Sequence, residues 1–289
     1  MEPRISVVIN TLNEERNLPY ALRSVRSWAD EIVVVDMYSD DHTVEIARQF
    51  GAKVYSHRRV GFVEPARAFA VSQATGDWVL ILDADELTPR PLSRKLIQIS
   101  QSETVDVVKV PYLNYIFGAP LMYSGCGPSQ AKHMRFFRRG SLHTTPAIHD
   151  YFHPVPGARV LELPYEPGHS IVHFAYLDAV QWVEKMNRYT SIEAEQRFER
   201  REHASPFKAL IHTMGMFLWM YIRRQGYRDG WRGFYYSALS GFYRLVTLAK
   251  LQGLERIGAR ARVEEVYRHD AERLLDEYGK ARTAVESRP

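Results

Sequence analysis

The fold is decided by the stretch Trp78-Val79-Leu80-Ile81-Leu82-Asp83-Ala84-Asp85-Glu86, in which a continuously apolar strand ends in closely spaced carboxylates. An apolar run of this kind is typical of a strand covered on both faces in a parallel or mixed sheet. Residues that follow such a strand emerge at the edge where open α/β sheets bind ligands. Because Mg2+ and Mn2+ prefer carboxylate oxygens, Asp83 and Asp85 are candidate metal ligands. The alternative is that they only cap the following segment, whose Pro89 suits the first turn of a helix.

Outward from this stretch, strands and short helices alternate along the first half of the chain. We predict strands at 5–10, 31–36, 53–57 and 78–82. We predict helices at 15–28 and 64–74, and a short one that ends near Gly51. This alternation predicts an α/β protein with a doubly wound, mostly parallel sheet.

Polar residues follow three of the predicted strands. In a parallel sheet these positions share one edge, so Thr11–Glu14, Asp36 and Asp83–Glu86 are expected to converge on a crevice that suits a nucleotide. The sequence has neither the dinucleotide-binding pattern Gly-x-Gly-x-x-Gly nor a P-loop. A carboxylate-rich site without a glycine cradle must neutralise phosphate charge in another way, which favours a cation held by Asp83 and Asp85.

Four motifs in order resemble glycosyltransferase family 2, whose members have the GT-A fold. They are Thr11-Leu12-Asn13-Glu14-Glu15, Val33-Val34-Val35-Asp36, Gly76-Asp77-Trp78 and Leu82-Asp83-Ala84-Asp85-Glu86. Within this family the chain is most similar to bacterial glucosyltransferases that extend the inner core of lipopolysaccharide. The similarity includes the later stretch Gly226-Tyr227-Arg228-Asp229-Gly230-Trp231-Arg232-Gly233.

The resemblance implies where a nucleotide-sugar donor binds. The turn after the first strand and Asp36 are expected to hold the nucleoside, and Arg67 is expected near the diphosphate, where a guanidinium forks onto phosphate oxygens. The family usually has Asn directly after this arginine, whereas Ala68 stands here. A surface helix position is the alternative for Arg67. The expected donor-binding residues are Thr11, Leu12, Asn13, Glu14, Asp36, Arg67, Asp83 and Ala84.

Inverting sugar transfer also requires a general base that deprotonates the acceptor hydroxyl. Asp150 looks like the family's catalytic acid position after a histidine, and His149 is its nearest rival. The alternative is that Asp150 is an ordinary loop residue.

Two further histidines, His169 and His173, are spaced so that one could approach the metal. Similar enzymes often carry a C-terminal histidine ligand, and His173 is the better match. The expected metal ligands of Mn2+ or Mg2+ are therefore Asp83, Asp85 and His173. The alternative is that both histidines bond neighbouring backbone in a buried strand.

The middle of the chain holds candidate acceptor-binding segments. A strand is expected to begin within 105–110, with a turn at 114–118 and a flexible loop at 125–128. The run Lys132-His133-Met134-Arg135-Phe136-Phe137-Arg138-Arg139 is basic and aromatic. It suits an anionic acceptor or even nucleic acid, but it is more typical of a half-buried edge strand.

The second half changes character, so we expect a catalytic domain over 1–175 and a helical region over 176–289. Residues 177–200 read as a helix, and 206–222 and 234–251 are strongly apolar but shorter than the roughly 20 residues of a spanning helix. The connector between them combines arginines with aromatic residues, a combination typical of elements that lie in a bilayer interface. A helical cap packed on the catalytic domain or on another subunit is the alternative. The connector arginines are Arg223, Arg224, Arg228 and Arg232, and the aromatic residues close by are Trp219, Tyr221, Tyr227 and Trp231.

Composition is compatible with this interpretation. The chain has 289 residues and a formal net charge of +4, which suits an anionic membrane surface but also suits nucleic acid. A single cysteine, Cys126, excludes an intrachain disulfide framework. No cleavable leader is recognisable, so we expect a cytoplasmic protein, peripheral on the inner face of the cell membrane.

Together these features predict a metal-dependent, inverting glycosyltransferase. It would move a hexose from a nucleoside diphosphate sugar, UDP-linked, to a lipid-linked or lipopolysaccharide-type saccharide, with no nucleic acid as partner. One alternative is transfer to a polyprenyl phosphate, for which Asp150 is dispensable. A sugar nucleotidyltransferase is disfavoured because its glycine-rich basic loop is absent. A non-catalytic membrane scaffold with a sugar-nucleotide fold would bind no donor.

Overall fold

A computed structural model describes residues 2–59, 64–144, 152–258 and 260–286. The chain forms two compact units, one of Met1–Lys185 with Phe217–Ala238 and the other of Met186–Met216 with Leu239–Pro289. The predicted domain boundary after residue 175 remains a prediction. The first unit carries the sheet and the candidate site.

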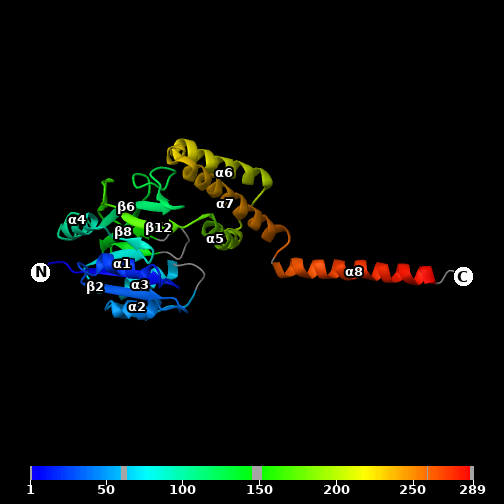
Figure 1. The fold of residues 1–289 in the computed structure, drawn as a ribbon, viewed down its shortest axis with the longest axis horizontal. Helices are drawn as coiled ribbons and strands as arrows, with labels where there is room; N and C mark the ends of the chain where they lie inside the picture. Colours follow the sequence, from blue (N-terminus) through cyan, green and yellow to red (C-terminus); the bar gives the residue numbers. More distant parts are fainter. Residues whose placement is uncertain (1, 60–63, 145–151, 259, 287–289) are drawn as a thin grey trace. The chain divides into compact units, whose positions relative to one another are not determined.

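The first unit is built on a mixed sheet with the strand order β3-β2-β1-β4-β8-β6-β12-β5. Figure 1 labels β2, β6, β8 and β12 of this sheet. Short strands β7 and β11 also pair with β6, and β9 pairs with β10 in a separate, two-stranded antiparallel sheet. The strands are β1 (Ile5–Thr11), β2 (Glu31–Asp36), β3 (Lys53–Ser56), β4 (Trp78–Asp83), β5 (Glu86–Leu87), β6 (Val107–Ile116), β7 (Ala119–Pro120), β8 (Lys132–Arg138), β9 (Leu142–Thr144), β10 (Phe152–Pro154), β11 (Val160–Glu162) and β12 (Ile171–Tyr176).

The N-terminal half of the sheet is parallel, as the sequence predicts. Strand β1 pairs in parallel with β2 on one side and β4 on the other, and β3 continues beyond β2. The chain therefore moves outward from β1 to β3 and then returns to the opposite side of β1. Open α/β sheets bind ligands beyond the carboxyl ends of the strands where this reversal occurs. In this protein that position lies between β1 and β4.

Helices cover both faces of the sheet. Val7 and Ile9 of β1 face a core shared with α1 (Leu18–Val25), α2 (Thr43–Gln49) and α4 (Arg90–Ser100). Val8 of the same strand faces a second core with α3 (Glu64–Gln73). Successive side chains of a strand point to opposite faces, so a strand with no polar alternation is stable only between two such layers. Helix α1 is shorter than its predicted range of 15–28, and α3 nearly matches its predicted range of 64–74.

Two predictions for the middle of the chain are wrong. The basic and aromatic run around Phe136 and Phe137 is not an edge strand, because β8 lies between β4 and β6 and both phenylalanines are buried. The predicted turn at 114–118 is also displaced. Strand β6 continues through Asn114 to Ile116, because it pairs with β12 there, and the turn follows at residues 117–118.

After β12 the chain is helical, as predicted. The helices are α5 (Ala179–Glu199), α6 (Pro206–Leu218), the π-helix η1 (Trp219–Arg223), the 3-10 helix η2 (Gly226–Asp229), α7 (Gly230–Arg256) and α8 (Arg260–Glu286). The second unit has a small apolar core that includes Ala194, Ala209, Leu248 and Leu251. Among the described residues, no helix has both the length and the apolar character needed to cross a bilayer.

Candidate active site

Three loops meet at the carboxyl edge of the parallel strands. The register places Thr11 of β1 opposite Asp36 of β2, and Asn10 of β1 opposite Asp83 of β4. The residues that follow these strands therefore share one edge of the sheet, where the sequence predicts a nucleotide crevice. This edge is the candidate active site.

Asp36 fixes the shape of one side of this edge. Its buried carboxylate accepts hydrogen bonds from the Thr11 hydroxyl at 3.0 Å, the Ser39 amide at 2.9 Å and the Ser39 hydroxyl at 2.6 Å. The Ser39 hydroxyl in turn accepts the Asn13 amide at 2.8 Å, and the Asn13 side-chain oxygen accepts the Asp40 amide at 2.8 Å. The loops after β1 and β2 are thus joined into one rim before any ligand binds.

The remaining donor candidates of the first loop have different surroundings. Leu12 packs against the apolar core on the α3 side of the sheet. The Glu14 carboxylate accepts a hydrogen bond from the Asn17 side chain at 2.8 Å. Burial raises the pKa of Glu14, and the nearby charges of Asp85 and Asp83 raise it further. Glu14 is therefore close enough to the carboxylates after β4 to sense their charge.

Asp83 is held by two arginines. The Nη2 atom of Arg67, on α3, donates to both carboxylate oxygens of Asp83, to Oδ1 at 2.7 Å and to Oδ2 at 2.5 Å. Arg135, on β8, lies 3.2 Å from Asp83 Oδ2 and 3.4 Å from Glu86 Oε1. Burial opposes the charged form of Asp83, but the two guanidinium groups outweigh it and hold the pKa of Asp83 far below its usual range. The neighbouring Ala84 is buried in the core.

Glu86 is a fully buried carboxylate beneath this pair. Its Oε2 accepts the backbone amide of Asp83 at 2.8 Å, which fixes the turn after β4. Burial raises the pKa of Glu86, and the Arg135 charge acts in the opposite direction. Glu86 therefore supports the loop that carries Asp83 and Asp85, and its own side chain is not exposed on the surface of that loop.

Asp85 and His173 face each other across the end of the sheet. Strand β12 pairs with β5 so that His173 lies opposite Glu86, and the Asp85 carbonyl accepts the Phe174 amide at 3.0 Å. This pairing puts His173 Nε2 at 3.6 Å from Asp85 Oδ2. Burial alone lowers the pKa of His173, but Asp85, Glu86 and Asp83 outweigh it and raise that pKa above its ordinary value.

The donor set after β4 fits a small divalent cation. Two ligands that each lie about 2.1 Å from one ion are roughly 3 to 4 Å apart, as are Asp85 Oδ2 and His173 Nε2. Across the described ranges, no group of three or more His, Cys, Asp and Glu side chains is arranged to hold a metal. Mg2+ and similar ions commonly take only one or two protein ligands and complete their shell with phosphate oxygens and water. Asp85 and His173 are the residues that would hold the ion.

Comparison with known proteins identifies the family. Residues 6–155, just over half of the 289-residue chain, match the model of glycosyl transferase family 2. The chain belongs to this family. An uncharacterized glycosyltransferase of Rickettsia typhi is 30% identical over 260 residues, which are 87% of each chain. The lipopolysaccharide core biosynthesis glycosyltransferase LpsC of Rhizobium meliloti is 26% identical over 277 residues, 92% of this chain and 98% of the relative.

Part of this family 2 glycosyltransferase is also similar to solved structures. Glucosyl-3-phosphoglycerate synthase from Mycobacterium tuberculosis, in complex with Mn2+, UDP and glucosyl-3-phosphoglycerate, is 30% identical with a TM-score of 0.34. The match covers 38% of this chain and 44% of that one. The predicted membership of family 2 and the predicted GT-A sheet are confirmed by the family match and by the strand order.

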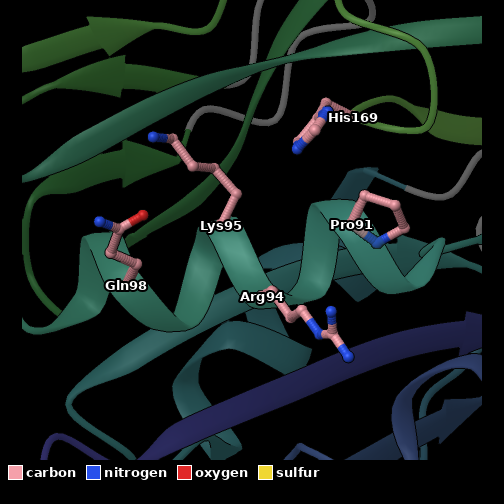
Figure 2. A pocket seen from close by; sticks show the side chains of 5 residues that line it. All are labelled: Pro91, Arg94, Lys95, Gln98 and His169. Carbon is pink, nitrogen blue, oxygen red and sulfur yellow. The ribbon is translucent and has the colours of Figure 1, made fainter.

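The other histidine and acid candidates of this glycosyltransferase have different positions. Asp150 and His149 lie outside the described residues, and their catalytic roles remain predictions. His169 precedes β12 and lines a surface pocket with residues of α4 (Figure 2). Its Nδ1 atom lies 3.5 Å from Glu166 Oε2. Figure 2 shows Arg94 on α4 pointing away from Lys95, so the basic residues of this pocket do not converge on one point.

Sequence reasoning missed two residues of the glycosyltransferase site. Arg135 binds Asp83 and Glu86, but the sequence places it only within a basic run. No sequence signal could have found it, because its position depends on the antiparallel pairing of β8 with β4, in which the next residue, Phe136, lies opposite Leu80. Asn114 bonds His173, and nothing in the sequence distinguishes it from a turn asparagine.

Proposed function

We propose that this family 2 enzyme is a metal-dependent, inverting glycosyltransferase. It transfers a hexose from a UDP-sugar to a lipid-linked or lipopolysaccharide-type saccharide. The observation that supports this proposal most directly is the 3.6 Å approach of Asp85 and His173, beside the locked rim around Asp36. The relative LpsC, named for lipopolysaccharide core biosynthesis, supports the acceptor class.

The donor is proposed to lie across the carboxyl ends of β1, β2 and β4. Its nucleoside contacts the rim formed by Thr11 to Glu14 and Asp36, whose loops are already joined by hydrogen bonds. Its diphosphate would lie next to Asp85 and His173, which would hold Mn2+ or Mg2+. When bound, such an ion stabilises the negative charge of the departing diphosphate. Asp83 remains a proposed ligand, although its carboxylate already pairs with Arg67 and Arg135.

In this proposal Arg67 both pairs with Asp83 and acts on the leaving diphosphate. It lies on α3 and is buried against Asp83, so it contributes a fixed positive charge at the edge where the diphosphate is placed. A fixed charge in a site of low dielectric stabilises developing negative charge without reorganisation. Arg67 would therefore assist the departure of the diphosphate from the β4 side of the crevice.

Transfer requires removal of one proton. The acceptor hydroxyl oxygen bonds to the anomeric carbon while the bond from that carbon to the diphosphate oxygen breaks. Asp150 is proposed to take the hydroxyl proton, with His149 as the rival base. The diphosphate leaves with the electron pair of the broken bond.

A lipid-linked acceptor requires the enzyme to reach a membrane, and the segment 219–235 of the first unit is suited to this contact. Tyr227, Trp231 and Tyr235 are each more than half exposed, and Ile222 is 59% exposed. Arg223 and Arg228 are exposed in the same segment. Aromatic rings favour the bilayer boundary and arginines favour anionic headgroups. We propose that this segment lies on the inner face of the cell membrane.

The test of the proposed function is donor hydrolysis in the absence of acceptor. The purified chain is incubated with a panel of nucleotide sugars, with and without Mn2+, and release of the nucleoside diphosphate is measured. We expect Mn2+-dependent hydrolysis of a UDP-hexose and a loss of about 100-fold or more in Asp85→Ala. Asp270→Ala, which removes a carboxylate on α8, serves as the matched control and should keep wild-type turnover. Metal-dependent turnover retained in Asp85→Ala would refute the proposal.

A further inference from the structure

A side-chain amide lies directly behind His173. Asn114, on β6, is opposite His173 in the β6–β12 register and is 8% exposed. Its Oδ1 atom lies 2.7 Å from His173 Nδ1, and its Nδ2 atom donates to the Cys126 carbonyl at 2.7 Å. His173 Nε2, on the other side of the ring, faces Asp85 at 3.6 Å. These contacts form one chain from the 121–130 loop to the proposed metal ligands.

The Cys126 carbonyl determines which way the amide points. A carbonyl oxygen only accepts hydrogen bonds, so the group that faces Cys126 must be the NH2 of Asn114. The amide oxygen of Asn114 then faces His173, and it also only accepts. The short contact therefore requires a proton on His173 Nδ1. In the neutral ring this leaves the lone pair on Nε2, the atom directed at Asp85.

The loop that carries this carbonyl is itself fixed. Asp229, from η2, accepts hydrogen bonds from the amides of Met122 at 2.9 Å and Tyr123 at 3.0 Å and from the Ser124 hydroxyl at 2.8 Å. A Cβ atom at Gly127 would lie 1.9 Å from the Met122 carbonyl oxygen, so the loop closes tightly on itself. A carbonyl on such a loop holds a constant direction.

We propose that Asn114 is a positioning residue that keeps His173 in the Nδ1-protonated form, with Nε2 free to bind the cation. The proposal rests on the proposed function only in that His173 is taken as a ligand. Histidine ligands commonly donate their second ring nitrogen to an oxygen acceptor, and loss of that acceptor typically weakens metal affinity 10- to 100-fold. The contact of Asn114 with Cys126 gives the preference its physical cause.

The tautomer is tested on the metal-free protein. Long-range proton–nitrogen correlations from 15N-labelled histidines are recorded at a pH where the ring is neutral, and His173→Ala assigns the signal. We expect the proton on Nδ1 in the wild-type chain and a mixture of both forms in Asn114→Ala. A proton on Nε2 in the wild-type protein would overturn the proposal, whatever the enzyme transfers. The wild-type result alone decides the outcome, and it needs no folded variant other than the His173→Ala used for assignment.

Metal affinity gives the second test. Mn2+ binding in the presence of UDP is titrated for wild type, Asn114→Ala, His173→Ala and the double variant, and thermal unfolding without ligand confirms that each is folded. We expect Asn114→Ala to weaken Mn2+ binding roughly 10- to 100-fold. In the His173→Ala background the same change should have no further effect, because Asn114 acts through that ring. Equal losses in both backgrounds would overturn the positioning role but leave the metal site intact. Failure of the wild type to bind Mn2+ would overturn both proposals.

Discussion

Glu31 joins three strands through one buried carboxylate. It accepts the Ser6 hydroxyl of β1 at 2.5 Å, the Lys53 ammonium of β3 at 2.7 Å, and the amide and hydroxyl of Thr75 at 2.7 Å and 3.0 Å. Burial opposes its charge, but these donors outweigh it and lower the pKa of Glu31 from 4.5 to about 2. Glu31 therefore ties together the segments at the amino end of β2, as Asp36 ties together the loops at the carboxyl end of the same strand.

We expect Glu31→Gln to lower the free energy of unfolding at neutral pH by about 2 kcal/mol. Since the folded-state pKa is lowered, the charge of Glu31 stabilises the fold above pH 4.5, and this contribution is lost as the pH falls from 4.5 toward about 2. Urea unfolding of wild type and variant at several pH values measures the difference. Glu45→Gln, at an exposed position of α2, is the control and should change little. A difference that stays constant from neutral pH down to pH 2 would contradict this explanation.

At the residue scale, the sequence was most informative where chemistry and strand position coincide. Asp36 and Asp83 each end an apolar run, so both their edge and their neighbours followed from the parallel order of strands. Arg135 and Asn114 were not foreseen, because their partners come from strands that are distant in sequence. Contacts between such strands depend on their pairing register, which one amino-acid sequence does not reveal.

At the scale of elements, the close contact between η2 and α7 depends on a glycine. A Cβ atom at Gly233 would lie 1.9 Å from the Gly226 carbonyl oxygen and 2.8 Å from Asp229 Cβ. Gly215, on α6, has open space at the equivalent position. A methyl group is therefore accommodated at Gly215, whereas at Gly233 it would clash with the backbone.

We expect Gly233→Ala to destabilise the fold by roughly 1 to 3 kcal/mol, because backbone must move to admit the methyl group. Gly215→Ala is the matched control and should stabilise the fold by about 0.5 to 1 kcal/mol, since alanine favours an exposed helix interior. Denaturant unfolding of the two variants measures both changes. Equal effects in the two variants would show that the contact of Gly233 with Gly226 has no energetic weight.

The predicted elements were correct where local pattern and tertiary pairing agree, and wrong where pairing dominates. The alternation of aromatic with basic residues predicts an edge position for β8, yet Lys132, Arg135 and Arg138 each have a partner. Arg138 stacks on Trp78 at 5.0 Å from the ring centroid, Lys132 pairs with Glu162 at 2.9 Å, and Arg135 pairs with Asp83. A charged strand is stable inside a sheet when its charges are compensated in this way.

At the scale of the whole molecule, membrane contact is the property that the segment 219–235 is expected to confer. We expect the wild-type chain to co-sediment with vesicles that contain anionic lipid, less with neutral vesicles, and less at high salt. Replacing Tyr227 and Trp231 by serine should weaken binding about ten-fold, because two exposed rings no longer enter the interface.

The control for this experiment is Tyr267→Ser on α8, where the ring is 71% exposed but lies outside the segment. Its binding should equal that of the wild type. Unchanged binding of the Tyr227 and Trp231 variant would contradict membrane docking through this segment. A change of oligomeric state in that variant would instead favour contact with another subunit.

The position of β8 also has a consequence for the order of synthesis. The apolar strand β4 has β1 on one side, but its other side is completed only by β8, which is made after α4 and all of β6. At about 5 to 20 residues per second, the nascent chain spends several seconds with this backbone edge unpaired. An open, apolar edge is a template for association with other chains. Ribosome-bound intermediates of this protein should therefore need chaperone protection until Arg138 has emerged, and a fragment that stops before β8 should aggregate.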